Sequence, residues 1–466
     1  MALHPALSAG RQHRPRHPLH GLANPALRED IVVPTERLAA QPLPAETAYQ
    51  LVHDELLLDG NAQLNLATFV TTWMEPEAGR LMAECAEKNM IDKDEYPQTA
   101  ELERRCVSML AHLWHAPVPE RAVGCSTTGS SEACMLAGMA LKRRWVRRRE
   151  AAGQPADRPN LVMGANVQVC WEKFCNYWEV EARTVPMEGE RFHLGAEEAV
   201  ALCDERTIGV LTVLGSTFDG SYEPVAEVAA ALDNLQATTG TDVPVHVDGA
   251  SGAMVAPFLD PDLLWDFRLE RVASINTSGH KYGLVYPGVG WVLWRDQEAL
   301  PAELIFNVNY LGGNMPTFAL NFSRPGAQIV GQYYMFLRLG SHGFQAVHQA
   351  SRDVATWLAG EIEKLGPFQL LTRGDELPVF AFTTVTGTNA FNVFDVSRRM
   401  RERGWLVPAY TFPPNRSDLS VLRVVVRNGF SRDLAELFVN DLARLVPELQ
   451  RQCGPLETGD AASFHH

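Results

Sequence analysis

Long apolar runs are missing from this 466-residue sequence, and none reaches the roughly 20 residues that a membrane-spanning helix requires. The first twenty residues also lack the apolar centre of a secretory signal. They contain arginine and histidine but no acidic residue, so a transit peptide is an alternative to the simpler interpretation, a disordered arm. We therefore expect a globular protein that has no membrane span and resides in the cytoplasm.

Positive charge is scarce as well, since 41 lysine and arginine residues stand against 56 acidic residues and the formal net charge is -15. This balance argues against nucleic acid or an anionic membrane as the main partner. The one strongly basic run, KRRWVRRR at 142–149, follows the helix-like EACMLAGMAL, and cations are favourable near a helix C-terminus. We interpret this run as the solvated end of a helix and predict no nucleic-acid partner.

Paired cysteines are also missing. The eight cysteines include no CxxC pair, and no His/Cys cluster has the spacing of zinc ligands. Scattered thiols in apolar stretches behave as small hydrophobes, which suits a reducing cytoplasm. Two phosphate-binding patterns, GxxxxGK and GxGxxG, do not occur either. The sequence therefore predicts no metal site and does not support those two nucleotide-binding classes.

What is present is the composition of a globular protein, with 46% hydrophobic and 21% charged residues. Short apolar runs alternate with helix-like segments, a pattern that indicates βαβ units and a mainly parallel sheet covered on both faces. The runs are 160–165, 207–215, 243–250 and 272–279. In the last hundred residues, PVFAFTTV and LSVLRVVVR have strand character and 431–450 has a strongly amphipathic helical pattern. We predict an α/β fold with a large domain and a smaller C-terminal α+β domain.

A lysine stands in an unexpected place in INTSGHKYGLVYPGVGWVLWR, residues 275–295, because lysine is seldom buried unless it is paired or chemically used. By itself, Lys281 could simply point to solvent where a strand ends. Two other polar residues, Thr217 and Asp248, also follow predicted strands, and ligands of open α/β sheets bind outside the carboxyl ends of the strands. A buried aspartate needs a cationic partner, and a buried lysine needs a chemical reason.

Pyridoxal phosphate meets both needs, because it forms a Schiff base with a lysine and its ring nitrogen is held protonated by a carboxylate. Its phosphate would require a glycine–serine turn that opens a helix, where free N–H groups and the helix dipole favour anions. Gly129, Ser130 and Ser131 in TTGSSEACM provide such a turn. The order of phosphate loop, Asp248 and Lys281 along the chain therefore predicts a pyridoxal-phosphate site.

Several strings resemble the glutamate decarboxylases, which are fold-type I pyridoxal-phosphate enzymes with an aspartate-aminotransferase-like fold. The strings are GSSEACMLAGMALKRRW, QVCWEKF, HVDGASG, SGHKYGLVYPGVGW, FNVNYLGG and NFSRP, and the resemblance runs from near residue 45 to near residue 450. It implies the conversion of L-glutamate to 4-aminobutyrate and CO2 with consumption of a proton. The expected organisation is an N-terminal arm and helix at subunit contacts (1–62), a large cofactor-binding domain (63–350), a small domain (351–452) and a flexible tail (453–466).

The resemblance also implies roles for individual residues toward the cofactor. Lys281 would be the Schiff-base lysine and Asp248 the partner of the pyridine nitrogen. The remaining expected contacts are Gln168 and Ala250 on the two ring faces, Thr217 at the ring hydroxyl, and Ser130, Ser131, Ser278 and His280 at the phosphate. Phe322 and Ser323 would reach the site from a neighbouring subunit, so the resemblance implies a homodimer at least, with a hexamer as the larger alternative.

For the substrate, the resemblance places the α-carboxylate of L-glutamate against Arg423 and the distal carboxylate in a pocket. The expected pocket residues are Thr68, Phe69, Asn89 and Asp92. From the residues alone, Arg423 and Arg427 lie on one strand face and periodicity does not choose between them. An aspartate beside a substrate carboxylate favours protonation of one of the pair, so we expect a mildly acidic pH optimum.

Two further features resemble parts that cover the site in this family. Tyr310 and Leu311, in NYLGGNMP, resemble a mobile loop whose tyrosine would take part in catalysis, although an ordinary surface loop is the alternative. The ending ASFHH resembles a tail that plugs the site at neutral pH, with His465 and His466 both candidates; floppy residues or a tag remnant are the alternatives. The Trp- and Lys-rich calmodulin-binding tail of plant members is missing.

The sequence departs from the family at two positions, and other functions stay open. Gly249 stands where alanine is common, and Glu172 stands where some bacterial members have histidine. A related decarboxylase or lyase that acts on another amino acid is the main alternative. An aminotransferase and a catalytically silent assembly subunit are further alternatives, and the presence of Lys281 and Asp248 disfavours the silent subunit.

Overall fold

The computed structural model describes residues 34–309, 315–385 and 391–451. The chain divides into two compact units, residues 1–61 and 62–466. In the described part of the first unit, α1 (Ala45–Leu56) begins after Pro44 and has Glu46 in its first turn, where the helix dipole favours an acidic side chain. This helix falls within the segment 1–62 that the sequence predicts to hold an N-terminal helix.

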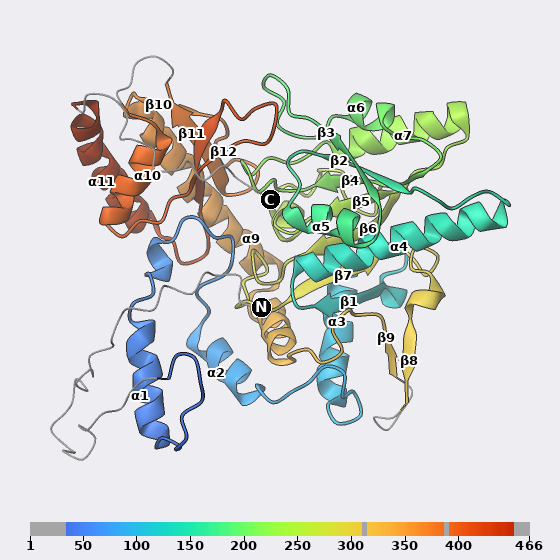
Figure 1. The fold of residues 1–466 in the computed structure, drawn as a ribbon, viewed down its shortest axis with the longest axis horizontal. Helices are drawn as coiled ribbons and strands as arrows, with labels where there is room; N and C mark the ends of the chain where they lie inside the picture. Colours follow the sequence, from blue (N-terminus) through green and yellow to red (C-terminus); the bar gives the residue numbers. More distant parts are fainter. Residues whose placement is uncertain (1–33, 310–314, 386–390, 452–466) are drawn as a thin grey trace. The chain divides into compact units, whose positions relative to one another are not determined.

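A seven-stranded sheet forms the centre of the second unit, in the order β1-β7-β6-β5-β4-β2-β3 (Figure 1). Its strands are β1 (Val123–Thr127), β2 (Asn160–Gly164), β3 (Glu181–Val185), β4 (Thr207–Val213), β5 (Val245–Asp248), β6 (Val272–Thr277) and β7 (Gly290–Trp294). The pairs β2–β3, β2–β4, β4–β5 and β5–β6 are parallel, whereas β7 is antiparallel to both β6 and β1. The predicted, mainly parallel sheet is confirmed, and β2, β4, β5 and β6 are its four predicted strands.

Alternate residues of the central strands face two separate hydrophobic clusters. Leu161 and Met163 of β2 pack with α4 and α5, whereas Val162 packs with α3 and α7. Helices therefore cover both faces, which explains why β2 and β4 are buried along their whole length. The helices around this sheet are α2 (Pro76–Glu84), α3 (Pro97–Leu113), α4 (Ser130–Ala151), α5 (Val169–Tyr177), α6 (Ala196–Ala201), α7 (Val225–Thr239) and α8 (Ala256–Leu259). The basic run 142–149 lies in the C-terminal part of α4.

A second, antiparallel sheet lies in the C-terminal part of the chain, in the order β10-β11-β13-β12. Its strands are β10 (Phe368–Leu370), β11 (Val379–Thr384), β12 (Ala409–Thr411) and β13 (Ser420–Val425), and its helices are α10 (Val393–Glu402) and α11 (Arg432–Gln450). The long α9 (Ala327–Lys364) precedes it and is interrupted at Gly340, where φ is 55° and ψ is -173°. The predicted smaller α+β part is therefore confirmed.

The short elements of the second unit connect these parts. A two-stranded ribbon joins β8 (Phe306–Val308) to β9 (Met315–Thr317). The 3-10 turns are η2 (Ala62–Leu64), η3 (Pro119–Arg121), η4 (Gly252–Met254) and η5 (Ala302–Leu304). Among the helices of the described ranges, none has both the length and the apolar character that crossing a bilayer requires.

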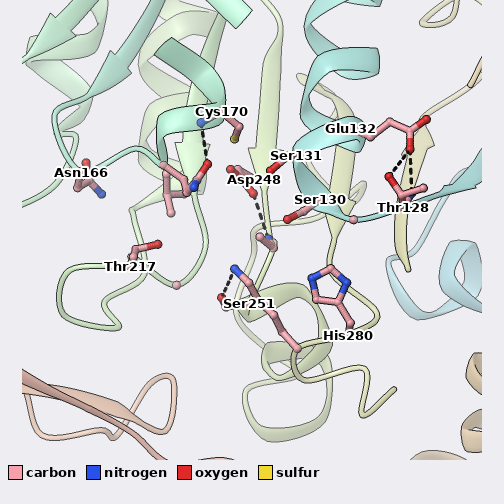
Figure 2. Close-up of a pocket in the computed structure, with 16 residues that line it drawn as sticks. Thr128, Ser130, Ser131, Glu132, Asn166, Cys170, Thr217, Asp248, Ser251 and His280 are labelled. Atoms are coloured by element: carbon pink, nitrogen blue, oxygen red, sulfur yellow. Dashed lines mark hydrogen bonds between the residues drawn. The ribbon is translucent and has the colours of Figure 1, made fainter. Parts of the chain in front are cut away.

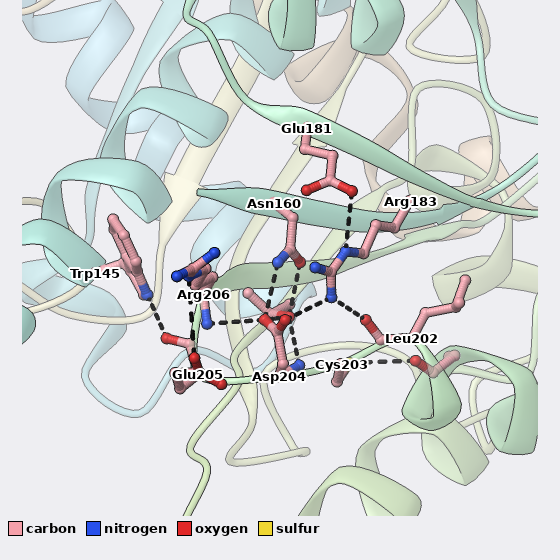
Figure 3. Close-up of polar contacts among 11 residues, drawn as sticks. Trp145, Asn160, Glu181, Arg183, Leu202, Cys203, Asp204, Glu205 and Arg206 are labelled. Atoms are coloured by element: carbon pink, nitrogen blue, oxygen red, sulfur yellow. Dashed lines mark hydrogen bonds and ion pairs between the residues drawn. The ribbon is translucent and has the colours of Figure 1, made fainter. Parts of the chain in front are cut away.

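A polar network holds the amino ends of β2, β3 and β4 together (Figure 3). Asn160 is fully buried; its Nδ2 donates to Asp204 Oδ1 at 2.9 Å, and its Oδ1 accepts from Thr207 Oγ1 at 2.8 Å. Arg183 of β3 forms an ion pair with Asp204 Oδ2 at 2.8 Å. These contacts connect three neighbouring parallel strands at one end, so the opposite, carboxyl ends are held at a common edge of the sheet.

Candidate active site

A cavity of about 300 Å³ lies at the carboxyl ends of β2, β4 and β5 and at the start of α4 (Figure 2). Eight of the residues predicted to bind the cofactor line it: Ser130, Ser131, Gln168, Thr217, Asp248, Ala250, His280 and Lys281. The fold thus collects around one cavity residues that the sequence distributes from 130 to 281.

Asp248 ends β5 and is only 4% exposed. Its Oδ1 accepts hydrogen bonds from Asn276 Nδ2 at 3.0 Å and from the Ala250 N–H at 3.1 Å. Its Oδ2 accepts from Trp171 Nε1 at 2.8 Å and from the Cys134 thiol at 3.6 Å. Four donors compensate for the burial of this carboxylate and fix its orientation in the cavity wall.

His246 extends this network, because it lies two residues before Asp248 on the same face of β5. Its Nε2 lies 2.8 Å from Asn276 Oδ1, and its Nδ1 lies 2.8 Å from Ser274 Oγ. Burial lowers the pKa of His246 to about 4, so the ring is neutral at physiological pH. Since Asn276 uses its amide nitrogen for Asp248, its oxygen accepts the Nε2–H of His246.

Two thiols also approach the carboxylate. The sulfur atoms of Cys134 and Cys170 and a carboxylate oxygen of Asp248 all lie within 4.8 Å of one another. Burial raises the pKa of Cys134 well above its usual value, so its sulfur is a neutral donor. The sequence spacing did not predict this group, because the three residues come from α4, α5 and β5.

Lys281 lies in the same cavity and has two contacts of interest. Its Nζ donates to Ser251 Oγ at 3.3 Å and lies 5.2 Å from the ring centroid of Phe69. Burial lowers the pKa of Lys281, and the negative charge of Asp248 opposes this effect. A lysine amine with a lowered pKa loses its proton more readily and reacts more easily as a nucleophile.

The start of α4 forms a second polar region of the cavity. Ser278 Oγ donates to Ser130 Oγ at 2.7 Å, so Ser278 is joined to this region although it does not line the cavity. A Cβ at Gly129 would lie only 2.9 Å from His280 Cε1, so glycine allows the imidazole to approach the first helical turn. Burial, together with a smaller effect of the Lys281 charge, lowers the pKa of His280 to about 4.

These donors fit pyridoxal phosphate. A buried carboxylate with fixed orientation suits a protonated ring nitrogen, and a buried lysine suits covalent attachment. The free N–H groups and serine hydroxyls at the start of α4 suit a phosphate.

Glu132 connects the phosphate region to a distant segment. Its Oε2 accepts from the Thr128 N–H at 2.8 Å and from Thr128 Oγ1 at 2.9 Å. Its Oε1 accepts from the N–H groups of Leu320 at 3.1 Å and Asn321 at 3.3 Å. One buried carboxylate therefore ties the turn before α4 to the segment that continues into Phe322 and Ser323.

The structure separates the two arginines that the periodicity left equivalent. Arg423 Cζ lies 4.8 Å from the centroid of Phe69, and its guanidinium donates to Ala67 O at 2.6 Å and to Thr217 O. Arg427 instead holds one loop through four acceptors: Ala62 O, Asn65 O, Val70 O and Thr72 Oγ1. Arg423 is therefore the arginine beside the cavity, and Arg427 has a structural position.

The other predicted residues form a second group that does not line the cavity. Asn89 Nδ2 donates to Ser323 Oγ at 3.2 Å, and Asn89 Oδ1 accepts from the Arg324 N–H at 3.1 Å. Asp92 donates its N–H to Asn89 O at 3.1 Å. The sequence-predicted substrate residues Asn89 and Asp92 thus lie next to the segment with Phe322 and Ser323. Thr68 does not line the cavity either, and its hydroxyl accepts from the Val70 N–H at 3.1 Å.

Some predicted residues fall outside the described ranges. These are Tyr310 and Leu311 of the predicted covering loop, and His465 and His466 of the tail.

Sequence reasoning missed several residues that the structure places in or behind the cavity wall. They are Glu132, Asn166, Ser251, His246, Trp171 and Asn276. Two signals were available. Ser251 belongs to the string HVDGASG, and Asn166 follows β2 as Thr217 follows β4. His246 and Asn276 required the β5–β6 register, which pairs Asp248 with Asn276.

Comparisons with known proteins agree with this chemistry. The pyridoxal-dependent decarboxylase conserved domain matches residues 39–385. The chain is 53% identical over 467 residues to a glutamate decarboxylase of Aliivibrio fischeri, which covers 96% of this chain and 100% of the relative. It is 50% identical over 428 residues to a glutamate decarboxylase of Solanum lycopersicum, with 91% and 85% covered. The solved glutamate decarboxylase of Lactobacillus brevis superposes with a TM-score of 0.88 at 46% identity, over 92% of this chain and 98% of the other.

Proposed function

The chain belongs to the pyridoxal-dependent decarboxylase family, and we propose that it converts L-glutamate to 4-aminobutyrate and CO2 with consumption of a proton. The observation that carries the proposal is the cavity in which Lys281, Asp248 and the start of α4 meet. Relatives named as glutamate decarboxylases, at about half identity over nearly the whole chain, support the choice of substrate.

Pyridoxal phosphate supplies an electron sink that stabilises the negative charge left on the substrate Cα when CO2 departs. In this proposal Lys281 anchors the cofactor, and Asp248 keeps its ring nitrogen protonated. The other contacts are Gln168 and Ala250 at the ring faces, Thr217 at the ring hydroxyl, and Ser130, Ser131, Ser278 and His280 at the phosphate. The four donors to Asp248 would keep the carboxylate in place during turnover.

Arg423 would bind and orient the α-carboxylate of glutamate. Two features support this role. Its guanidinium and Lys281 Nζ lie over the same phenylalanine ring, and its buried Nε has no hydrogen-bond partner among the described residues. An arginine suits a carboxylate because its planar guanidinium offers several donors.

The distal carboxylate would bind near Thr68, Phe69, Asn89 and Asp92. Because like charges at contact distance keep one carboxyl protonated, Asp92 would give a mildly acidic optimum. A pH–rate profile of Asp92→Asn that equals the wild-type profile would contradict this cause. Tyr310 and Leu311 would cover the site, exclude water and direct the proton to the substrate Cα.

We further propose a homodimer at least, with a hexamer as a larger possibility, in which Phe322 and Ser323 contact the cofactor of the neighbouring subunit. The support is an exposed apolar region. Phe306, Leu320 and Phe322 are exposed, and they border a groove of about 450 Å³ whose other wall includes Leu136 and Met139 of α4. Apolar patches of this kind mark interaction surfaces.

The proposal includes the domain division 63–350 and 351–452 and a cytoplasmic location. The seven-stranded sheet ends at Trp294 and the four-stranded sheet begins at Phe368, which supports a division between them. The seven cysteines of the described ranges are free thiols, which suits a reducing compartment.

The first test is product identification. The cofactor-loaded protein is incubated with a mixture of amino acids at mildly acidic pH, and the amines and keto acids formed are identified. We expect 4-aminobutyrate alone, no product from Lys281→Ala, and an unchanged rate for Lys364→Ala, a lysine in an exposed ion pair with Glu361. If another amine accumulates while glutamate persists, the cofactor site stands and the substrate assignment is wrong.

A further inference from the structure

The cavity wall contains a polar side chain that the mechanism above does not use. Asn166 lies in the turn between β2 and α5, lines the cavity and is only 1% exposed. Neither its Oδ1 nor its Nδ2 has a hydrogen bond of normal geometry among the described residues, although the amide lies close enough to Glu223 to lower the pKa of that carboxyl. Buried side-chain amides are nearly always paired, because an unpaired one loses its hydration without compensation. An unpaired amide in a cavity wall therefore indicates a contact with the ligand.

A buried carboxyl group lies next to this amide, on the side away from the cavity lining. Glu223 is 3% exposed, with Oε1 accepting from the Leu194 N–H at 2.8 Å and Oε2 from the Val213 N–H at 2.6 Å. A Cβ at Gly164 would overlap Asn166 Oδ1 and would lie 3.1 Å from Glu223 Oε1. The two oxygen atoms thus converge above Gly164, where only a glycine leaves room for both.

We propose that Asn166 is a further binding residue of this site, which donates its amide N–H to an oxygen atom of the bound cofactor or substrate, and that Glu223 decides which end of the amide faces the cavity. This inference rests on the proposed function, since it assigns a residue to that same site.

The protonation state of Glu223 determines whether it donates a hydrogen bond to Asn166 or accepts one. A protonated Glu223 donates its O–H to Asn166 Oδ1, which leaves Nδ2 free to donate into the cavity. An ionised Glu223 accepts from Nδ2, which turns Oδ1 toward the cavity and repels an oxygen of the ligand. The side-chain amide can adopt either orientation by a simple flip.

The surroundings of Glu223 place this change near neutral pH. Burial raises the pKa of Glu223 to about 7, against the lowering effects of the Leu194 and Val213 N–H groups and the Asn166 amide. Among the described titratable groups, His193 also acts on Glu223 and favours its ionised form, and it acts in the same direction on Asp219 and Glu376. Acid therefore favours the orientation in which Asn166 donates to the ligand.

The oxygen acceptor can come from two sources, and the position of Asn166 favours the cofactor. Figure 2 shows Asn166 and Thr217 on the side of the cavity away from Ser130 and His280. Thr217 is the residue proposed for the ring hydroxyl, so Asn166 would share this oxygen. A substrate carboxylate is the other source of the same chemistry.

The test measures binding, so that its outcome is separate from activity. The dissociation constant of pyridoxal phosphate is measured for the full-length apoprotein at about pH 6 and about pH 8, on either side of the Glu223 pKa. The affinity of the cofactor-loaded protein for glutarate, an unreactive dicarboxylate, is measured at both pH values. Asn166→Ala should weaken one of the two affinities, for pyridoxal phosphate or for glutarate, by about tenfold at the lower pH, which is the loss expected for one hydrogen bond. Asn166→Ser, which keeps a small donor, should lose less.

Glu223→Gln carries the second half of the test. The glutamine amide can donate to Asn166 Oδ1 at every pH, while it keeps only one of the two backbone N–H bonds of Glu223, so the affinity at the higher pH should approach the affinity at the lower pH. Glu376→Gln is the matched control, because this glutamate is also largely buried and accepts a backbone N–H, that of Tyr222, but does not line the cavity. It should keep the wild-type pH dependence.

The outcomes separate this inference from the proposed function. If Asn166→Ala loses affinity for pyridoxal phosphate, Asn166 binds the cofactor. If it loses affinity for glutarate alone, Asn166 binds the substrate. If Asn166→Ala folds with wild-type melting temperature and both affinities stay within about twofold, Asn166 is not a binding residue. A Glu223→Gln protein with unchanged pH dependence overturns the role of Glu223. Formation of 4-aminobutyrate by the wild type would stand in either case.

Discussion

Lys281 and Arg423 share one aromatic ring: Lys281 Nζ lies 5.2 Å, and Arg423 Cζ 4.8 Å, from the ring centroid of Phe69. The ring is buried, so both cations lie against it in a region where water screens them little. The Arg423 charge contributes to lowering the pKa of Lys281, after the larger effect of burial. This arrangement leaves a positively charged region beside the cavity that suits a substrate carboxylate.

The two strand arginines should respond differently to the same substitution. Arg423→Lys should raise KM for glutamate by at least about tenfold, because an ammonium group cannot replace the planar guanidinium at a carboxylate. Arg427→Lys should leave KM nearly unchanged and lower the melting temperature, because Arg427 holds the carbonyl groups of its loop. Steady-state kinetics and thermal unfolding of both variants check this. A larger KM effect for Arg427→Lys would contradict the assignment.

Replacing His246 should disturb Asp248 through Asn276. His246→Phe leaves Asn276 Oδ1 without its donor in a buried site. We therefore expect a loss of about 1–3 kcal/mol in the free energy of unfolding and weaker binding of the cofactor. His246→Gln retains an N–H donor and should recover part of both losses. Cofactor dissociation constants and chemical unfolding measure the two effects. Equal behaviour of the two variants would mean that this hydrogen bond has no part in holding the carboxylate.

The free energy of unfolding should depend on pH through two opposing groups. The pKa of Glu223 is raised by burial from 4.5 to about 7, so its stabilising contribution is complete below pH 4.5 and is lost as the pH rises to about 7. The pKa of His246 is lowered by burial from 6.5 to about 4, so its contribution is complete above pH 6.5 and is lost as the pH falls to about 4. In the wild type the two slopes partly cancel.

Single substitutions should reveal how much each group contributes to the pH dependence of the free energy of unfolding. Relative to the wild type, Glu223→Gln should make the unfolding free energy rise more steeply with pH between these limits, by on the order of 3 kcal/mol in total. His246→Gln should change the slope in the opposite direction. Urea unfolding of the full-length proteins across this pH range gives both slopes. Parallel curves for wild type and variant would show that the group does not change its pKa on folding.

Removing the carboxylate of Glu132 should loosen two segments together. Glu132→Ala removes both oxygen acceptors, Oε2 for Thr128 and Oε1 for Leu320, so the turn before α4 and the segment 320–323 should both lose hydrogen bonds. We expect weaker cofactor binding and faster hydrogen exchange of the Leu320 and Asn321 amides, measured by mass spectrometry. Glu303→Ala, which removes a partner of Arg143 on the surface, is the control. An effect confined to one segment would show that Glu132 does not couple them.

Much of the fold could be predicted from local patterns. The four strands predicted for the large sheet became β2, β4, β5 and β6, because a strand buried on both faces needs a short continuous apolar run that is visible in the sequence. The strands β1, β3 and β7 were not predicted. β3 lies at the sheet edge and exposes most of its residues, so its composition resembles that of a loop.

The sequence by itself determined the cofactor chemistry, because Lys281, Asp248 and the turn at Ser130 each follow or precede an element whose pattern is local. Only the tertiary structure decided which arginine lies beside the cavity, which residues hold Asp248, and that Asn166 meets Glu223. These relationships depend on strand register and on contacts between segments far apart in the chain, such as the pairing of Asp248 with Asn276. Periodicity states which face a residue occupies, whereas packing decides what lies opposite that face.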